Sequence, residues 1–160
     1  MMQEGRIRMA FSNAGKYRLL AVDDDQNSAE LIVRTALRCG YESFPAHNAK
    51  TLRDIVPHWR PNVITLDLSL PDVDGFELIS SLKSVEFTGE LLIISGQPEW
   101  FRKQAAQFAA ISGLRVTAHL PKPIEVAELR DLLTTMKAGL FLTLLNQFAP
   151  RADTPQKMKA

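Results

Sequence analysis

The stretch VITLD at residues 63–67 is the clearest guide to the fold. Its first four residues are apolar or β-branched and an aspartate follows at once, a pattern typical of a short strand buried on both faces. The stretch YRLLAV at 17–22 has the same character and stops at three consecutive aspartates, residues 23–25. Three further runs complete a set of five predicted strands: 41–46, which is weaker, 91–94 and 116–120.

Helical patterns separate the predicted strands. Apolar residues recur there at intervals of three and four, as on the inward face of an amphipathic helix. We expect helices at 28–39, after Asn48, from Asp74, at 98–111 and from Ile124 onward. Alternating strands and helices of this length predict one doubly wound α/β domain, in which five helices flank a five-stranded parallel sheet.

Local signals predict where several helices begin and end. Gly40 stands where a left-handed C-cap is favourable, and Asn48 can cap the helix that follows it. Pro57 and a second proline four residues later are predicted to end that helix. Asp74, with Glu77 three residues on, predicts a capping box at the start of the third helix.

The overall composition excludes several classes of protein. The 160 residues carry a formal net charge of +1, which gives no general attraction to nucleic acid or anionic membranes. Cys39 is the only cysteine, so no internal disulfide is possible and we expect a reducing compartment. No apolar run approaches the roughly 20 residues of a membrane span, and the first residues lack the pattern of a secretory signal. We therefore expect a cytoplasmic protein without direct binding to nucleic acid or membrane.

Polar side chains stand where four of the predicted strands end. Asp23 and Asp24 follow the first strand, Asp67 the third and Ser95 the fourth, and the fifth strand runs into Lys122. In an open parallel sheet the carboxyl ends of the strands share one edge, and ligands bind in the crevice beyond it. Three carboxylates there would repel one another, a conflict that a hard divalent cation such as Mg²⁺ resolves. A lysine and a hydroxyl beside them suit a bound phosphoryl group, and a central carboxylate can itself be the nucleophile.

Each of these residues also has an ordinary structural explanation. Two aspartates after a strand often cap a helix, and a single aspartate in a loop is usually solvated. Lys122, which lies between two prolines, could occupy a surface turn, and Ser95 alone carries little information. The functional interpretation rests on the agreement of four strand ends within one topology.

Four segments together resemble the receiver domains of two-component response regulators, in particular the chemotaxis-regulator type. The resemblance spans about residues 18–137 and implies a flavodoxin-like fold with strand order 2-1-3-4-5. The segments are LAVDDD at 20–25, ITLDLSLPDVDG at 64–75, IISG at 93–96 and LPKP at 120–123.

The resemblance assigns a role to each carboxylate by its position. Asp67 would be the phosphoacceptor, and Asp23 and Asp24 would hold Mg²⁺ together with Asp67 and the backbone carbonyl of Ser69. A sensor histidine kinase or a phosphotransfer protein would be the donor. The domain would catalyse its own phosphorylation and dephosphorylation, and no independent enzyme activity is expected.

The same resemblance points to a conformational switch. Ser95 would be the hydroxyl that moves to the phosphoryl group, and Lys122 would be its ion-pair partner. His119 stands three residues before Lys122, where the family usually has Tyr or Phe whose rotation reports phosphorylation. It is therefore a candidate switch residue, with a structural imidazole as the alternative. Ser69 and Gln97 occupy positions that tune dephosphorylation in the family and vary widely.

Several functions are compatible with such a domain. The leading interpretation is a phosphorylation-controlled interaction module, whose downstream partner binds the face formed by the fourth helix, the fifth strand and the fifth helix. The alternative is the receiver part of a longer regulator with a C-terminal effector, such as a cyclic-di-GMP phosphodiesterase. A phosphatase of the haloacid-dehalogenase type would need a second acid two residues after Asp67, where Ser69 stands. No basic recognition helix follows the receiver, so DNA binding within this chain is not expected.

The last predicted helix continues past the domain. We divide the chain into a flexible N-terminal segment (1–16), a receiver domain (17–137), and a C-terminal helical extension and tail (138–160). An apolar stripe of three- and four-residue spacing runs from the domain into the extension. Its members are Leu129, Leu133, Met136, Leu140, Leu144 and Phe148.

This stripe predicts a contact between helices. Leu140, Phe141 and Leu144 are the candidate interface residues, either for a homodimer or for an effector domain. One alternative is that the helix bends back onto the domain. Another is that the N-terminal segment covers it with the side chains of Ile7, Met9 and Phe11.

Overall fold

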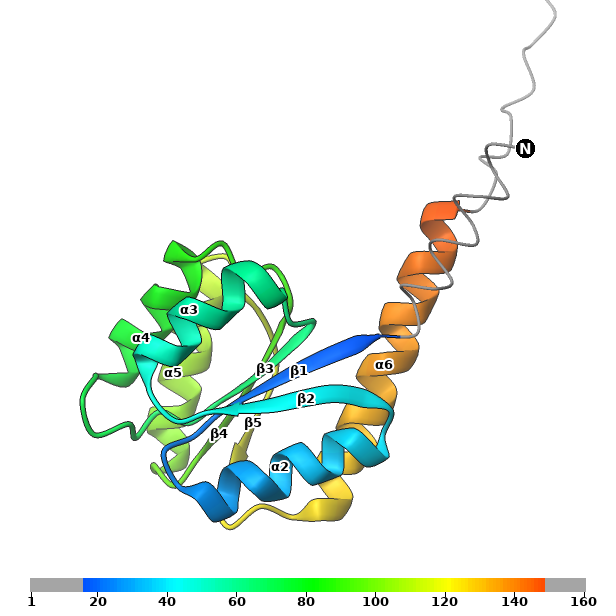
Figure 1. Ribbon diagram of the computed structural model, residues 1–160. Coiled ribbons are helices and arrows are strands. Elements are labelled where there is room, and N and C mark those ends of the chain that lie inside the picture. Colours follow the sequence, from blue (N-terminus) through cyan, green and yellow to red (C-terminus); the bar gives the residue numbers. More distant parts are fainter. Residues whose placement is uncertain (1–15, 149–160) are drawn as a thin grey trace, which may run out of the picture.

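A computed structural model describes residues 16–148 and shows one α/β domain with a long final helix (Figure 1). Its five strands are parallel and lie in the order β2-β1-β3-β4-β5, which confirms the predicted doubly wound sheet. The strands are β1 (Tyr17–Val22), β2 (Tyr41–Ala46), β3 (Val63–Leu66), β4 (Glu90–Ser95) and β5 (Arg115–Pro121).

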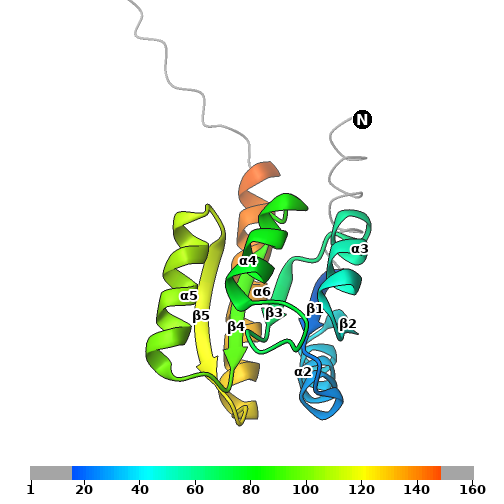
Figure 2. The same cartoon turned by 90° about the vertical axis from the view of Figure 1, so that its left-hand side faces the viewer.

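Five helices cover the two faces of the sheet, as expected. One face carries α2 (Gln26–Arg38) and α6 (Val126–Phe148). The other carries α3 (Ala49–Trp59), α4 (Gly75–Ser84) and α5 (Glu99–Ile111), which lie side by side in Figure 2. Each of the first four strands is thus followed by a helix that returns the chain to the start of the next parallel strand, and β5 leads into the final helix.

The core forms two layers because side chains along a strand alternate between the faces of the sheet. In β1, Leu19 and Ala21 pack in the layer shared with α2 and α6. Leu20 and Val22 pack in the layer beneath α3, α4 and α5. All four side chains are almost completely buried, so β1, an inner strand of the sheet, contributes to both layers.

The predicted caps are mostly correct. Gly40 has a φ of 84°, as a left-handed C-cap requires, and the side chain of Asn48 accepts a hydrogen bond from the Thr51 N–H. At the start of α4 the carboxylate of Asp74 accepts from Phe76 N–H. Asp74 is therefore confirmed as the N-cap, but its bond goes to the residue before Glu77, and the predicted capping box is wrong within the described residues.

The prediction that two prolines end this helix is right for Pro61, which directly follows the C-cap, and wrong for Pro57. Pro57 lies inside α3, which continues to Trp59 and ends at Arg60 in a left-handed conformation with a φ of 50°. A proline in a helix deprives the carbonyl four residues earlier of its partner. Here that carbonyl belongs to Arg53, and both Arg53 and Pro57 are exposed, so solvent can take the place of the missing donor.

The final helix continues well beyond its last contacts with the sheet layer. The ammonium of Lys137 donates to the carbonyls of Cys39 and Gly40, which ties α6 to the turn between α2 and β2. From there α6 runs without interruption to Phe148 and projects from the domain (Figure 1). The alternative in which the helix bends back is therefore wrong, whereas Ile7, Met9 and Phe11 lie outside the described residues. Within residues 16–148, no helix has the length and apolar character needed to cross a membrane.

Candidate functional site

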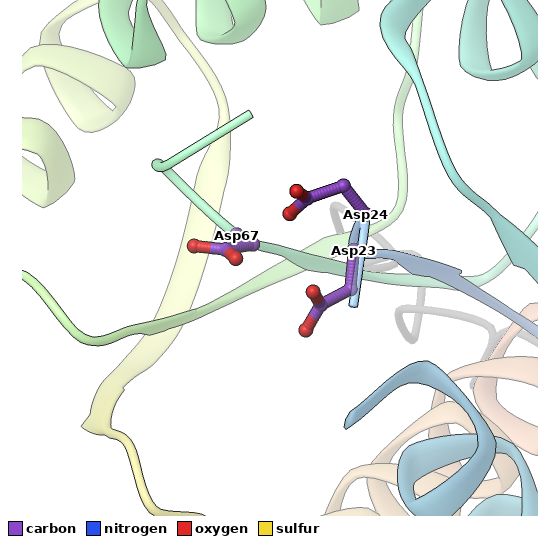
Figure 3. Close-up of side chains that lie close together, drawn as sticks. All are labelled: Asp23, Asp24 and Asp67. Atoms are coloured by element: carbon purple, nitrogen blue, oxygen red, sulfur yellow. The ribbon is translucent and has the colours of Figure 1, made fainter. Parts of the chain in front are cut away.

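The carboxyl ends of β1 and β3 bring three carboxylates together (Figure 3). The parallel register places Val22 beside Leu66, so Asp23 and Asp67 follow at equivalent positions of neighbouring strands. One carboxylate oxygen from each of Asp23, Asp24 and Asp67 lies within 4.8 Å of the others. Asp23 and Asp67 are buried, at 1% and 4% exposed, while Asp24 is exposed. The structure therefore assembles the acidic cluster that the sequence predicted.

Lys122 brings a positive charge into this cluster from the end of β5. Its Nζ lies 2.7 Å from Oδ2 of Asp23 and 2.9 Å from Oδ2 of Asp67. Burial by itself would lower the pKa of Lys122, but the hydrogen bonds to Asp23 and Asp67 outweigh it and hold the pKa above its usual value. The side chain is therefore an ammonium at neutral pH, and it bridges the two buried carboxylates.

The loops after β3 and β4 meet above the cluster. The Ser69 N–H donates to Oδ1 of Asp67 over 3.0 Å, and the Gln97 side-chain amide donates to the Ser69 hydroxyl over 3.1 Å. Ser95 is fully buried at the end of β4, and its hydroxyl accepts from the Gln97 N–H over 3.2 Å. The Lys122 N–H donates to the Ser95 carbonyl. All the predicted site residues named here thus occupy one edge of the sheet, with the Ser95 hydroxyl held by its own loop.

His119 lies on β5 and is partly buried. Its Nδ1 atom is buried and has no hydrogen-bond partner within residues 16–148. No hydrogen bond at Nδ1 in this part of the chain therefore supports the alternative that His119 is a structural imidazole.

Two polar contacts of the site were not predicted. His47 follows β2, and its Nδ1 lies 2.9 Å from the Asp23 carbonyl oxygen, to which it can donate in one tautomer. The pairing of Ala46 with Val22 gives the signal, since it makes the next residues, His47 and Asp23, neighbours. The second contact is made by Arg102 of α5, which is buried and donates from its side chain to the Gln97 carbonyl. Its inward position follows from its spacing with Ala105 and Ala109.

Residues 19–134 match the sequence model of the response regulator receiver domain. The chain belongs to this family. The match covers β2 to β5 and all of β1 except its first two residues, together with the acidic cluster and Lys122.

Individual relatives agree with this receiver assignment. Sporulation initiation phosphotransferase F of Bacillus subtilis is 28% identical over 114 residues, which cover 71% of this chain and 88% of the relative. The phosphate regulon transcriptional regulatory protein PhoB of Pseudomonas aeruginosa is 31% identical over 124 residues. The match covers 76% of this chain and 51% of PhoB, so the chain spans about half the length of that relative. A response regulator from Colwellia psychrerythraea, known from a crystal structure, is 27% identical with a TM-score of 0.66, covering 77% of this chain and 98% of the other.

The donor set of this receiver domain fits a hard divalent cation. Three carboxylates face one ammonium, which leaves two net negative charges at the cluster when the acids are ionised. Carboxylate oxygens are the ligands that Mg²⁺ prefers, and receiver domains typically bind this ion. Within the described part of the chain Asp24 has no bond to Lys122, so its carboxylate remains free to bind the cation.

Exchange of Asp24 for asparagine keeps the shape of the side chain and removes one negative charge. Without divalent cations we expect Asp24→Asn to be more stable than the unchanged chain by about 1 kcal/mol, because repulsion within the cluster is relieved. With Mg²⁺ added, the unchanged chain should gain more stability than the variant, because the ion binds more tightly to the unchanged chain. Urea denaturation with EDTA and with Mg²⁺ measures both effects.

Asp131→Asn is the matched control, because the Asp131 side chain is 79% exposed on α6 and is not part of the acidic cluster. It should change neither the stability without Mg²⁺ nor the gain with it. Equal gains from Mg²⁺ in Asp24→Asn and in the unchanged chain would exclude Asp24 as a ligand.

Proposed function

We propose that the chain is a phosphoacceptor that takes a phosphoryl group on Asp67 from a sensor histidine kinase or a phosphotransfer protein. The observation that supports this most strongly is the bridge from Lys122 to Asp67, beside the carboxylates of Asp23 and Asp24. Asp67 is buried and directly follows the last residue of β3, at the edge where an open parallel sheet binds its ligands. The carboxylate is thereby held in one orientation for attack on an incoming phosphorus atom.

The transfer needs no nucleophile of this chain other than Asp67. A carboxylate oxygen of Asp67 attacks phosphorus, the P–N bond of the donor phosphohistidine breaks, and the electron pair stays on the departing imidazole nitrogen, which takes up a proton. The product is an acyl phosphate on Asp67. Lys122 neutralises charge on the phosphoryl oxygens. Mg²⁺, held by Asp23, Asp24, Asp67 and the backbone carbonyl of Ser69, would supply further charge neutralisation when bound.

We propose that phosphorylation is read out by a rearrangement of the loop after β4. Ser95 would turn its hydroxyl toward the phosphoryl group, while Lys122 keeps its ion pair there, so that both residues favour one of two conformations. His119 would follow in place of the usual aromatic ring. The output face would consist of α5, β5 and α6, on which Trp100 and Ile111 are 60% and 87% exposed and available to a downstream partner.

A second candidate is the receiver part of a longer regulator that acts in the cytoplasm. The observation that favours it is the coverage of about half of PhoB. An effector domain, of which a cyclic-di-GMP phosphodiesterase is one example, would then receive the signal. The length of the native gene product distinguishes this candidate from a free-standing module.

We also propose that the receiver domain ends near residue 137 and that the extension of α6 mediates a homodimer. The helical residues 138–148 contain no charged side chain. Phe141, Leu142 and Leu145 are 41%, 59% and 39% exposed, whereas Leu140 and Leu144 are partly buried. Of the three residues predicted from the sequence, Phe141 therefore exposes the most apolar surface to a second helix. This exposed surface supports a helix-to-helix contact.

The phosphoacceptor proposal predicts that Asp67→Asn loses phosphate incorporation from acetyl phosphate in the presence of Mg²⁺. The amide is not a nucleophile under these conditions, although it occupies the same space. Asp72→Asn is the control, because Asp72 is an exposed aspartate five residues further along the same loop. Radiolabel that persists in Asp67→Asn at the rate of the control would place the acceptor elsewhere.

The dimer proposal predicts that Phe141→Lys shifts the chain to monomer in sedimentation equilibrium. A charge at this position would have to be buried in a helix pair. Thr143→Lys lies on the opposite side of the same helical turn and should leave the dimer intact. An unchanged chain that remains monomeric at high concentration would rule the dimer out.

A further inference from the structure

Arg102 is a cation in an environment that does not favour one. The residue is only 9% exposed, and no carboxylate lies within ion-pair distance of it in residues 16–148. Glu99, on the same helical turn, pairs with Lys103 over 3.1 Å instead. Arg102 also lies near the N-terminus of α5, where the helix dipole disfavours positive charge. A buried and unpaired charge of this kind costs stability, so its presence calls for another explanation.

The guanidinium of Arg102 is directed at a single loop carbonyl. Its Nη1 donates to the Gln97 carbonyl oxygen over 2.6 Å, a short charge-assisted bond. Its Nε is buried and has no partner in the described part of the chain. The polar interactions of this side chain are therefore concentrated on Gln97, in the loop between β4 and α5.

Gln97 connects Arg102 to the proposed phosphorylation site. Its N–H donates to the hydroxyl of Ser95, and its side-chain amide donates to the hydroxyl of Ser69. Ser69 in turn donates its N–H to Asp67. A continuous chain of hydrogen bonds thus runs from the buried cation in α5 to the acceptor carboxylate.

We propose that Arg102 is a positioning residue that holds the loop after β4 in its unphosphorylated arrangement. This inference rests on the proposed function of Asp67 and Ser95. When the Ser95 hydroxyl turns toward a phosphoryl group, it leaves the Gln97 N–H. In this proposal Gln97 moves with the loop, and its carbonyl then withdraws from Arg102.

The bond from Arg102 therefore opposes the switch. It stabilises the conformation without phosphate. A ligand that binds only the switched conformation therefore has a lower apparent affinity, reduced in proportion to the small population of that conformation. Loss of the guanidinium should make the chain easier to switch, although the residue touches neither the phosphoryl group nor the metal ligands.

The test compares the affinity for beryllium trifluoride, a tetrahedral analogue of the phosphoryl group, in the presence of Mg²⁺. Arg102→Met removes every donor and suits a buried position. It should bind the analogue about three- to tenfold more tightly than the unchanged chain, as expected for loss of one opposing hydrogen bond. Arg102→Lys keeps a charged donor and should stay close to the unchanged chain. Lys103→Gln, on the exposed side of the same turn, is the control and should have no effect.

A second readout needs no ligand. In Arg102→Met, the backbone amide resonances of Ser95, Gly96 and Gln97 should move toward the positions they take in the unchanged chain with the analogue bound. A folded Arg102→Met that binds the analogue with equal or weaker affinity overturns the role of Arg102 alone. Failure of the unchanged chain to bind the analogue would instead contradict the phosphoacceptor proposal on which this role rests.

Discussion

The ammonium of Lys122 forms a bridge between the buried carboxylates of Asp23 and Asp67, and the rest of the site is arranged around it. The lysine is 99 residues from Asp23 and 55 from Asp67, so only the parallel sheet brings the three groups together. Removing the cation would leave two buried negative charges side by side, at a cost of roughly 3–5 kcal/mol. The same cation cannot neutralise three acids. This imbalance favours the binding of Mg²⁺, whose charge would then offset that of an incoming phosphoryl group.

Much of this arrangement could be predicted because it follows from local chemistry. The apolar run before Asp67, the aspartates after β1 and the cap at Asn48 each depend on a few neighbouring residues. The parallel topology then brings the polar strand ends to one edge, whatever the details of packing. Pro57 was misjudged because the tolerance of a helix for proline depends on whether the affected carbonyl is exposed, which only the assembled domain determines.

The contacts that escaped prediction are those that depend on the direction of a side chain. The bond from Arg102 to Gln97 requires the guanidinium to turn back toward the start of its own helix, and no spacing in the sequence encodes that choice. The extension of α6 is a similar case. Its stripe was evident from periodicity, but the sequence did not show that Leu140 packs against the core layer beneath α2 and α6 while Leu142 stays exposed.

The central claim is that this charge arrangement makes Asp67 the phosphoacceptor. The most direct measurement is to treat the unchanged chain with acetyl phosphate and Mg²⁺, reduce the acyl phosphate with borohydride, and locate the modified residue by peptide mass spectrometry. The account predicts one modified residue, Asp67, and none when EDTA replaces Mg²⁺. Modification of another residue in place of Asp67, or equal modification of Asp67 without a divalent cation, would contradict it.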